Sequence, residues 1–378
     1  MKDDISIVGA GPAGLTAAIV LAGHGLKVRV YDMSPDVGHR LNGDFQGLEN
    51  WSSEKDITEL LRQIGIRINF LCVPYTCGIV YAPGRGPAKV DSGRPIFYLV
   101  KRGPLQGTLD AGLKEQALAA GVEIIFNRRF DGPDEVTGST IIATGPKGVD
   151  MAALGVTFET NAEDRAIVAF GDDVAPKGYS YLLIHKGYGT LATVLFGGYR
   201  KGSECFENML RFYGERVHID MKHEQRFTSY GNFFISDTLV QDRRLYIGEA
   251  AGFQDFLWGF GMRYAVMSGY WAARSLIDGT DYDMLWKREL KPALETSLVN
   301  RYLFERAGNA GYRYLTGRFA GGNPCGFLRK HYNYSFLKHL FLFFAKRSYS
   351  GKFIFQAPGR EGASHGMCRR SMKYTTHL

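Results

Sequence analysis

The chain alternates short apolar, β-branched runs with longer stretches whose apolar positions recur at helical spacing. Residues 5–8 form the first run, which enters a glycine-rich turn and continues into a helical pattern, and residues 27–31 form the second, which ends on Asp32. This order predicts a strand, a helix and a parallel strand. Residues 103–126 read as a helix followed by a strand, and 139–145 add a further apolar strand that we expect in the same sheet.

A different pattern fills the rest of the chain. Strands separated by proline and glycine turns are predicted within 68–82 and 95–100, and the sequence stays strand-rich from 151 to 236. We expect these segments to form an antiparallel sheet on the substrate side of the molecule. With 378 residues, the chain is long enough for two domains and an appendage.

The opening turn has the spacing G-x-G-x-x-G after a strand and before a helix. Gly9 makes the tight turn, Gly11 lets a pyrophosphate approach backbone N–H groups, and Gly14 lets the helix lie close to the strand. Asp32 lies near the ~20-residue spacing of an acid that accepts hydrogen bonds from a ribose. These features predict dinucleotide binding, and a glycine-rich turn without a ligand is the alternative.

Two nearby segments can reach the same ligand. In the polar segment 33–47, Arg40 can contact a phosphate and Gly43 lets the backbone approach a ring, although an ordinary surface loop would have the same composition. The strand at 139–145 ends in Gly145, which can touch a cofactor or simply end a strand.

A second glycine-rich segment, residues 244–273, has matching chemistry. A short strand leads to Glu249, whose carboxylate can accept a hydrogen bond from a sugar-alcohol hydroxyl. A helix is predicted to start near Gly261, and its N-terminal N–H groups can stabilise a ring carbonyl that becomes anionic on reduction. This geometry fits a flavin.

Together these motifs resemble the p-hydroxybenzoate hydroxylase-like flavoprotein superfamily and, within it, the geranylgeranyl reductase family. The resemblance covers residues 1–145 and 240–280 and is most specific in the helix with Ser268, Gly269, Ala272 and Ala273. It implies an α/β fold with a Rossmann-like FAD-binding domain, an inserted antiparallel β-sheet substrate domain and a helical C-terminal region. The expected FAD-binding residues are Gly9, Gly11, Ala13, Gly14, Asp32, Arg40, Asn42, Gly43, Arg102, Gly145, Glu249, Gly252, Gly259, Gly261 and Met262.

The resemblance also implies domain boundaries. We expect a discontinuous FAD-binding domain at 1–70, 98–150 and 237–290, a substrate-side sheet domain at 71–97 and 151–236, and a C-terminal helical region at 291–378.

Several positions depart from the family pattern. Glu249 stands where the family usually has Asp, Phe256 stands where it often has Pro, and Asn42 stands where the reductases often have Cys. The Tyr-x-Trp-x-Phe-Pro pattern of the substrate sheet is reduced to the sequence at 179–184. The Asp-Gly motif of the hydroxylases is replaced at 143–145, which weakens a monooxygenase interpretation.

The expected activity is hydride transfer from reduced FAD to a C=C bond of an isoprenoid or another hydrophobic substrate. Tyr181 and His185 are the candidate catalytic residues, with Tyr188 as a further proton donor, although a single His after an apolar strand is more often structural. Cys72 and Cys77 can form a redox pair, but buried thiols are the simpler interpretation.

Partners are less well defined by the sequence. There is no second nucleotide motif, so electrons are expected from transiently bound NAD(P)H or a small electron-transfer protein. An aromatic hydroxylase-like monooxygenase, a nucleic-acid-modifying enzyme and a protein-partnered electron-transfer flavoprotein are the alternatives. Nucleic acid is disfavoured because no RNA-binding signature is present.

The net charge of +8 is compatible with an anionic partner, and the five cysteines indicate the cellular compartment. The cysteines are odd in number and lack metal-type spacing, which favours a reduced cytoplasmic compartment and no metal site. The start of the chain lacks a signal-peptide pattern, and no apolar run is long enough to span a bilayer. Aromatic and basic residues at 330–355 predict either a helix lying on the inner face of the cell membrane or a helix packed on the FAD domain.

Overall fold

The computed structural model describes residues 4–130, 138–333 and 335–349. Its first sheet has six strands in the order β15-β16-β9-β1-β2-β8, all parallel except the edge strand β15. The strands are β1 (Ile5–Val8), β2 (Val28–Tyr31), β8 (Glu123–Ile125), β9 (Thr140–Ile142), β15 (Val240–Gln241) and β16 (Arg244–Tyr246). The expected βαβ unit and its later returning strands are therefore present.

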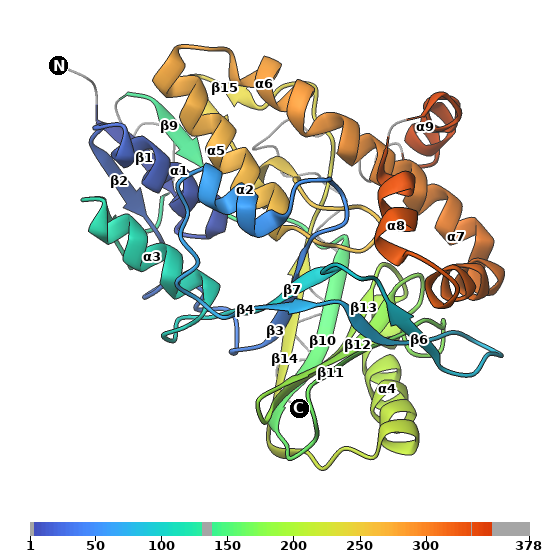
Figure 1. Cartoon of the computed structure of the whole chain (residues 1–378). Helices are drawn as coiled ribbons and strands as arrows, with labels where there is room; N and C mark the ends of the chain where they lie inside the picture. The colour runs from blue at the N-terminus through green and yellow to red at the C-terminus, as the bar shows by residue number, and fades with distance from the viewer. Residues whose placement is uncertain (1–3, 131–137, 334, 350–378) are drawn as a thin grey trace.

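Helices α3 (Leu109–Ala119) and α5 (Met262–Asp278) pack on helix α1 (Pro12–Gly23) beside this sheet, and the contact between α1 and α5 is especially close. In α1 every side chain from Ala13 to Leu21 is buried, because α3 and α5 both pack against it. Gly269 of α5 lies against the backbone of α1, where an added Cβ would be 2.3 Å from the carbonyl oxygen of Ala13. Only glycine allows this close approach of α5 to α1. Figure 1 shows the two helices next to each other beside the first sheet.

The second sheet has seven strands in the order β14-β10-β13-β12-β11-β5-β6 and is antiparallel except for the β11–β5 pair. Its strands are β5 (Cys77–Tyr81), β6 (Ala88–Asp91), β10 (Met151–Glu159), β11 (Arg165–Ala169), β12 (Tyr179–His185), β13 (Tyr188–Leu195) and β14 (Lys222–Gly231). The amphipathic helix α4 (Gly202–Val217) packs on β10 and β13. The strand-rich segment expected at 151–236 therefore also contains a helix.

A small third sheet, β3-β7-β4, is formed by β3 (Phe45–Glu49), β7 (Phe97–Lys101) and β4 (Cys72–Tyr75). The polar segment 33–47, for which an ordinary surface loop is the alternative, becomes a strand at its end, because Phe45 begins β3. Phe45 is buried and its N–H donates to the hydroxyl of Thr190, which joins this sheet to the second one.

Helices complete the chain: α2 (Ile57–Gln63), α6 (Tyr282–Glu289), α7 (Lys291–Ala320), α8 (Pro324–Tyr332) and α9 (Phe336–Ser348), with short 3₁₀ turns at Tyr199–Lys201 and Gly248–Ala251. Helix α7 is kinked at Gly308, where φ is +48°. Figure 1 shows α7 running along one side of the molecule, with α8 and α9 beside it. Within the described residues, no helix is long and apolar enough to cross a membrane.

Candidate functional site

The glycine turn places a bare helix N-terminus at the end of β1. Gly9 has φ +112°, and an added Cβ there would be 2.1 Å from the carbonyl oxygen of Ala143. Gly11 caps α1 with no side-chain hydrogen bond, and the first turn has no acidic residue. An added Cβ at Gly11 would meet nothing within 4 Å. The free N–H groups of this turn therefore face open space that can hold an anion.

Asp32 fixes this turn from the end of β2. One carboxylate oxygen accepts the N–H of Ala10 at 2.7 Å and the other accepts the N–H of Ser34 at 2.8 Å. A carboxylate has about four acceptor positions, so Asp32 can still accept a ribose hydroxyl.

A cavity of about 1450 Å³, open to solvent, extends from this turn to the second sheet. The expected residues that line it are Gly11, Ala13, Arg40, Arg102, Gly145, Tyr181, Glu249, Gly259, Gly261 and Met262. Segments separated by more than two hundred residues thus form one continuous wall, as the predicted FAD site requires.

Other expected residues lie outside this lining within the described chain: Gly9, Gly14, Asp32, Asn42, Gly43, Gly252 and His185. Gly9 and Gly14 shape the turn from behind. Gly252 has φ +74° and packs on the backbone and ring of Phe234, which is a structural role. The side chain of Asn42 is exposed, while its N–H donates to Asp44.

Charged groups line the cavity near the glycine turn. Arg40 forms an ion pair with Glu249 at 3.2 Å. Burial raises the pKa of Glu249, and the positive charge of Arg40 opposes that rise. Arg102 is fixed by two hydrogen bonds to the buried Asp110, at 2.8 and 2.9 Å, and by one to Gln46 at 3.2 Å. A polar group bound here would meet guanidinium groups that are already oriented.

The 252–261 loop forms the wall at the start of α5. Gly261 caps α5 without a side-chain hydrogen bond and with no acid in the first turn. Gln254 donates its amide to the carbonyl oxygen of Gly259 at 2.7 Å, while its Oε1 is buried and has no hydrogen-bond partner within the described structure. A buried unpaired acceptor in a cavity wall is available to a donor group of a ligand or to ordered water.

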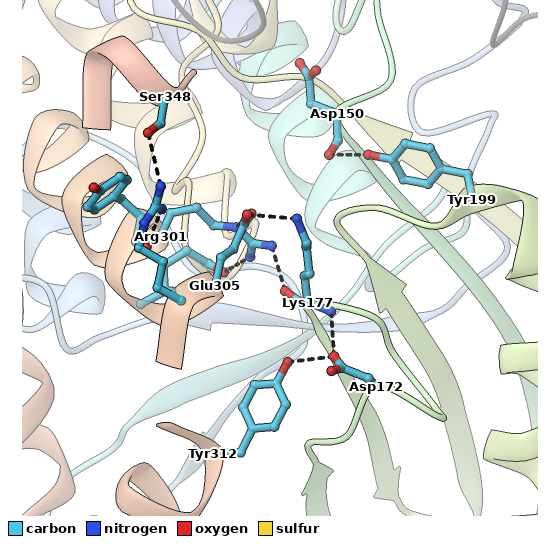
Figure 2. Close-up of polar contacts among 11 residues, drawn as sticks. Asp150, Asp172, Lys177, Tyr199, Arg301, Glu305, Tyr312 and Ser348 are labelled. Atoms are coloured by element: carbon cyan, nitrogen blue, oxygen red, sulfur yellow. Dashed lines mark hydrogen bonds and ion pairs between the residues drawn. The ribbon is translucent and has the colours of Figure 1, made fainter. Parts of the chain in front are cut away.

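Helix α7 supports this loop from behind through Arg301, which is 1% exposed. Its guanidinium donates to the carbonyl oxygens of Leu257 at 3.2 Å and Lys177 at 2.7 Å, and to Glu305 at 2.7 Å. Figure 2 shows Arg301 and Glu305 projecting from the helix toward Lys177, in the turn that joins β11 to β12 of the second sheet. The C-terminal region is thereby tied to both the loop and the sheet.

A second cavity of about 810 Å³ adjoins the first. Phe97, Val168, Tyr179 and Phe260 line both cavities. The remaining wall is made almost entirely of aliphatic and aromatic groups: Trp51, Cys77, Gly78, Ile79, Val80, Val90, Ile96, Ala166, Phe170, Trp258, Phe319, Pro324 and Leu328. The hydroxyl of Tyr179 is already engaged, because it donates to the carbonyl oxygen of Trp258 at 2.8 Å.

The candidate catalytic residues lie in different places. Tyr181 of β12 lines the cofactor cavity, and burial holds its pKa well above the ordinary value, so the phenol is neutral. His185 is buried and its Nδ1 lies 2.7 Å from a carboxylate oxygen of Asp164, away from the lining. The amino group of Lys101 lies over the ring of Tyr188, 4.3 Å from the ring centroid.

The two cysteines of the strand region do not share one environment. Cys72 is half-buried, and burial raises the pKa of its thiol to about 12. Cys77 is exposed and lines the apolar cavity, so the interpretation of two buried thiols is wrong for Cys77. Both thiols are free, with no disulfide between them.

Several lining residues were not expected from the sequence: Asp44, Gln46, Tyr230, Gln254 and Phe260. Gln254 and Phe260 lie inside the glycine-rich segment 244–273, so their place in the cavity wall could have been predicted from the sequence. Asp44 and Gln46 reach the cavity because β3 forms, and Tyr230 because β14 pairs with β10.

Comparisons with known proteins agree with this architecture. A family profile described as an NAD(P)-binding Rossmann-like domain matches residues 7–44. Over 98 residues, the chain is 36% identical to a thiamine thiazole synthase from Methanococcus maripaludis, a match covering 25% of this chain. The chain spans 37% of the length of that relative.

The similarity to solved structures extends over most of the chain. A geranylgeranyl bacteriochlorophyll reductase-like protein from Thermoplasma acidophilum superposes with a TM-score of 0.67 at 16% identity, covering 92% of this chain and 96% of that one. A flavin-dependent brominase triple mutant superposes with a TM-score of 0.62 at 15% identity, covering 92% and 100%. The fold is that of these flavoproteins. The p-hydroxybenzoate hydroxylase-like architecture expected from the sequence is confirmed.

The groups in and beside the cavity match the chemistry of a flavin dinucleotide. The bare N-terminus of α1 and Arg40 suit a pyrophosphate, and Asp32 suits a ribose. At the other end, the start of α5 and the unpaired Oε1 of Gln254 suit the carbonyl and N–H groups of a ring.

Proposed function

We propose that this protein is an FAD-dependent oxidoreductase that reduces C=C bonds in a long hydrophobic substrate such as an isoprenoid. The observation that carries the proposal is the apolar cavity that adjoins the cofactor cavity through Val168, Tyr179 and Phe260. A hydrocarbon chain can fill such a space without leaving polar groups unpaired. An aromatic acid or phenol would lack polar partners there, which disfavours a hydroxylase.

The residues that would hold the cofactor follow from the site. Gly11, Ala13 and the first turn of α1 bind the pyrophosphate, Asp32 accepts the adenosine ribose hydroxyls, and Arg102 lies beside the dinucleotide. Glu249 accepts a hydroxyl of the sugar-alcohol chain, as its position in the wall supports.

When bound, FAD supplies the hydride that a C=C reduction requires. The second carbon of the bond needs a proton, and Tyr181 is placed to donate it because its phenol lines the cavity between the two sheets. Burial raises the pKa of this phenol, so the donation requires that the phenolate be reprotonated in turn. Tyr181 lines the cavity that is open to solvent and not the apolar one, so a fixed phenol competes there with water as the proton source. NAD(P)H or a small electron-transfer protein is proposed as the electron source.

The test is anaerobic. Protein reduced with dithionite and mixed with a geranylgeranylated lipid should reoxidise, and mass spectrometry should find a lipid that has gained hydrogen. The Val168→Phe variant, which narrows the junction of the cavities, should lose this reaction while retaining FAD, and the conservative Val168→Ile variant should keep it. Reoxidation only on admission of oxygen, with a hydroxylated or halogenated product, would contradict the proposal.

A further inference from the structure

Helix α9 exposes more large apolar side chains than any other helix or strand within the described ranges. Phe336, Leu340, Phe341, Phe343 and Phe344 are all exposed, with exposed fractions of 75% for Phe336 and 66% for Phe343. No other described element exposes more than two large apolar residues. Clusters of this kind are rare on monomeric soluble proteins and mark an interaction site.

The exposed cluster is not the packing face of the helix. Leu342, Ala345 and Tyr349 are buried on the opposite side, where α9 packs on α7. Lys346 fixes the helix to α7 through an ion pair with Glu295 at 2.8 Å. The helix therefore packs on α7, inside the expected C-terminal region, and the exposed phenylalanines leave a second apolar face on α9. Figure 1 shows α9 beside α7.

The charges around this face have one sign. Residues 336–348 contain Lys338, His339, Lys346 and Arg347 and no acidic residue. Arg347 and His339 are exposed, and Arg347 lies on the same side of the helix as Phe336, Leu340 and Phe343 by the helical repeat. Among the described residues, two carboxylates lie against α9 and both are already paired: Glu295 with Lys346, and Glu305, which interacts with Tyr349, with Arg301.

We infer that α9 is a docking surface for an anionic lipid bilayer. Exposed phenylalanines beside arginine are the composition of a helix that lies in the interface plane, with rings below the headgroups and cations among the phosphates. A second copy of the chain fits less well, because a two-fold contact would bring two Arg347 side chains into one interface to which α9 contributes no carboxylate. The segment that follows α9 is also basic, with one acidic residue, Glu361, against Lys352, Arg360, Arg369, Arg370 and Lys373. Repulsion between like charges therefore disfavours this segment as the partner that covers the exposed face of α9.

The test uses the full chain and vesicles of phosphatidylcholine alone or mixed with phosphatidylglycerol. The protein should co-sediment with the anionic vesicles and be released as salt rises. Phe343→Ser with Phe344→Ser should weaken binding by roughly tenfold or more, since each ring contributes buried apolar area. Arg347→Gln should weaken it by about fivefold.

A matched control is Tyr314→Ser, which removes a ring that is 59% exposed on α7 beyond the kink. It should bind like the parent protein. Thermal unfolding of each variant identifies any that fails to fold. The inference is overturned if the parent chain stays in the supernatant with every vesicle. It is also overturned if light scattering finds a dimer that the Phe343→Ser, Phe344→Ser variant abolishes. The inference does not rest on the proposed activity, which needs no vesicle to be measured.

Discussion

The phenol of Tyr332 on α8 donates a hydrogen bond to the carboxylate of Asp255 in the 252–261 loop, at 2.9 Å and out of contact with solvent. The other carboxylate oxygen of Asp255 accepts the N–H of Trp258. Because Gly259 and Gly261 line the cofactor cavity, this pair connects the C-terminal helices to the wall of the site.

Asp255 makes the stability of the protein dependent on pH. Burial raises its pKa from 3.8 to about 7, against the opposing hydrogen bonds from Trp258 and Tyr332. An acid with a folded pKa above its unfolded pKa binds its proton more tightly when folded. The free energy of unfolding therefore falls as pH rises from about 4 to about 7, by about 4 kcal/mol for this group.

The variant Asp255→Asn isolates this contribution. Urea unfolding across that pH range should give a parent curve that declines with pH relative to the curve of the variant. The amide can still pair with Tyr332, so the variant should fold. Parallel curves for the two proteins would show that Asp255 does not take up a proton on folding.

Arg301 should be the most costly basic residue to remove from α7. Replacing it with methionine leaves the carbonyl oxygens of Leu257 and Lys177 without their donor and removes the guanidinium that lies 4.0 Å from the ring centroid of Phe196. A loss of about 3–5 kcal/mol is expected from chemical denaturation. Figure 2 shows the contact of Arg301 with Lys177.

The matched control for that change is Arg313→Met on the same helix, where the side chain is exposed. It should alter the free energy of unfolding by less than about 0.5 kcal/mol. Equal losses for the two variants would contradict a special role for Arg301.

Tyr181 and Tyr179 provide a paired test of the proposed proton donor. Tyr181→Phe should lower the rate of C=C reduction by about a hundredfold or more, with FAD affinity unchanged. Tyr179→Phe removes a hydroxyl that already donates to Trp258, so it should cost about 1 kcal/mol of stability and little of the rate. Single-turnover reoxidation measures both rates, and an unimpaired Tyr181→Phe would exclude Tyr181 as the donor.

The parts of the site that the sequence predicted are those set by local spacing. Gly11, Glu249 and Gly261 could be placed because a strand, a turn and a helix follow one another within a few residues. Asp255 could not be assigned, since its partner Tyr332 comes from a helix 77 residues away. Gly252 lies outside the cavity lining, and its packing against Phe234 is sufficient to require a glycine there, so sequence spacing alone does not tell a packing glycine from a ligand-binding one.

Substitutions in the glycine turn can distinguish a glycine that packing requires from a glycine that the ligand requires. An added Cβ at Gly14 would be 2.0 Å from the carbonyl oxygen of Gly9, so Gly14→Ala should lower the melting temperature even without cofactor. Gly11 has extended backbone and open space around it, so Gly11→Ala should melt like the parent in the absence of FAD. Its methyl group would project toward the pyrophosphate position and should weaken FAD binding by roughly tenfold or more in a fluorescence titration. If Gly11→Ala instead bound FAD as tightly as the parent, the pyrophosphate would not lie on this turn.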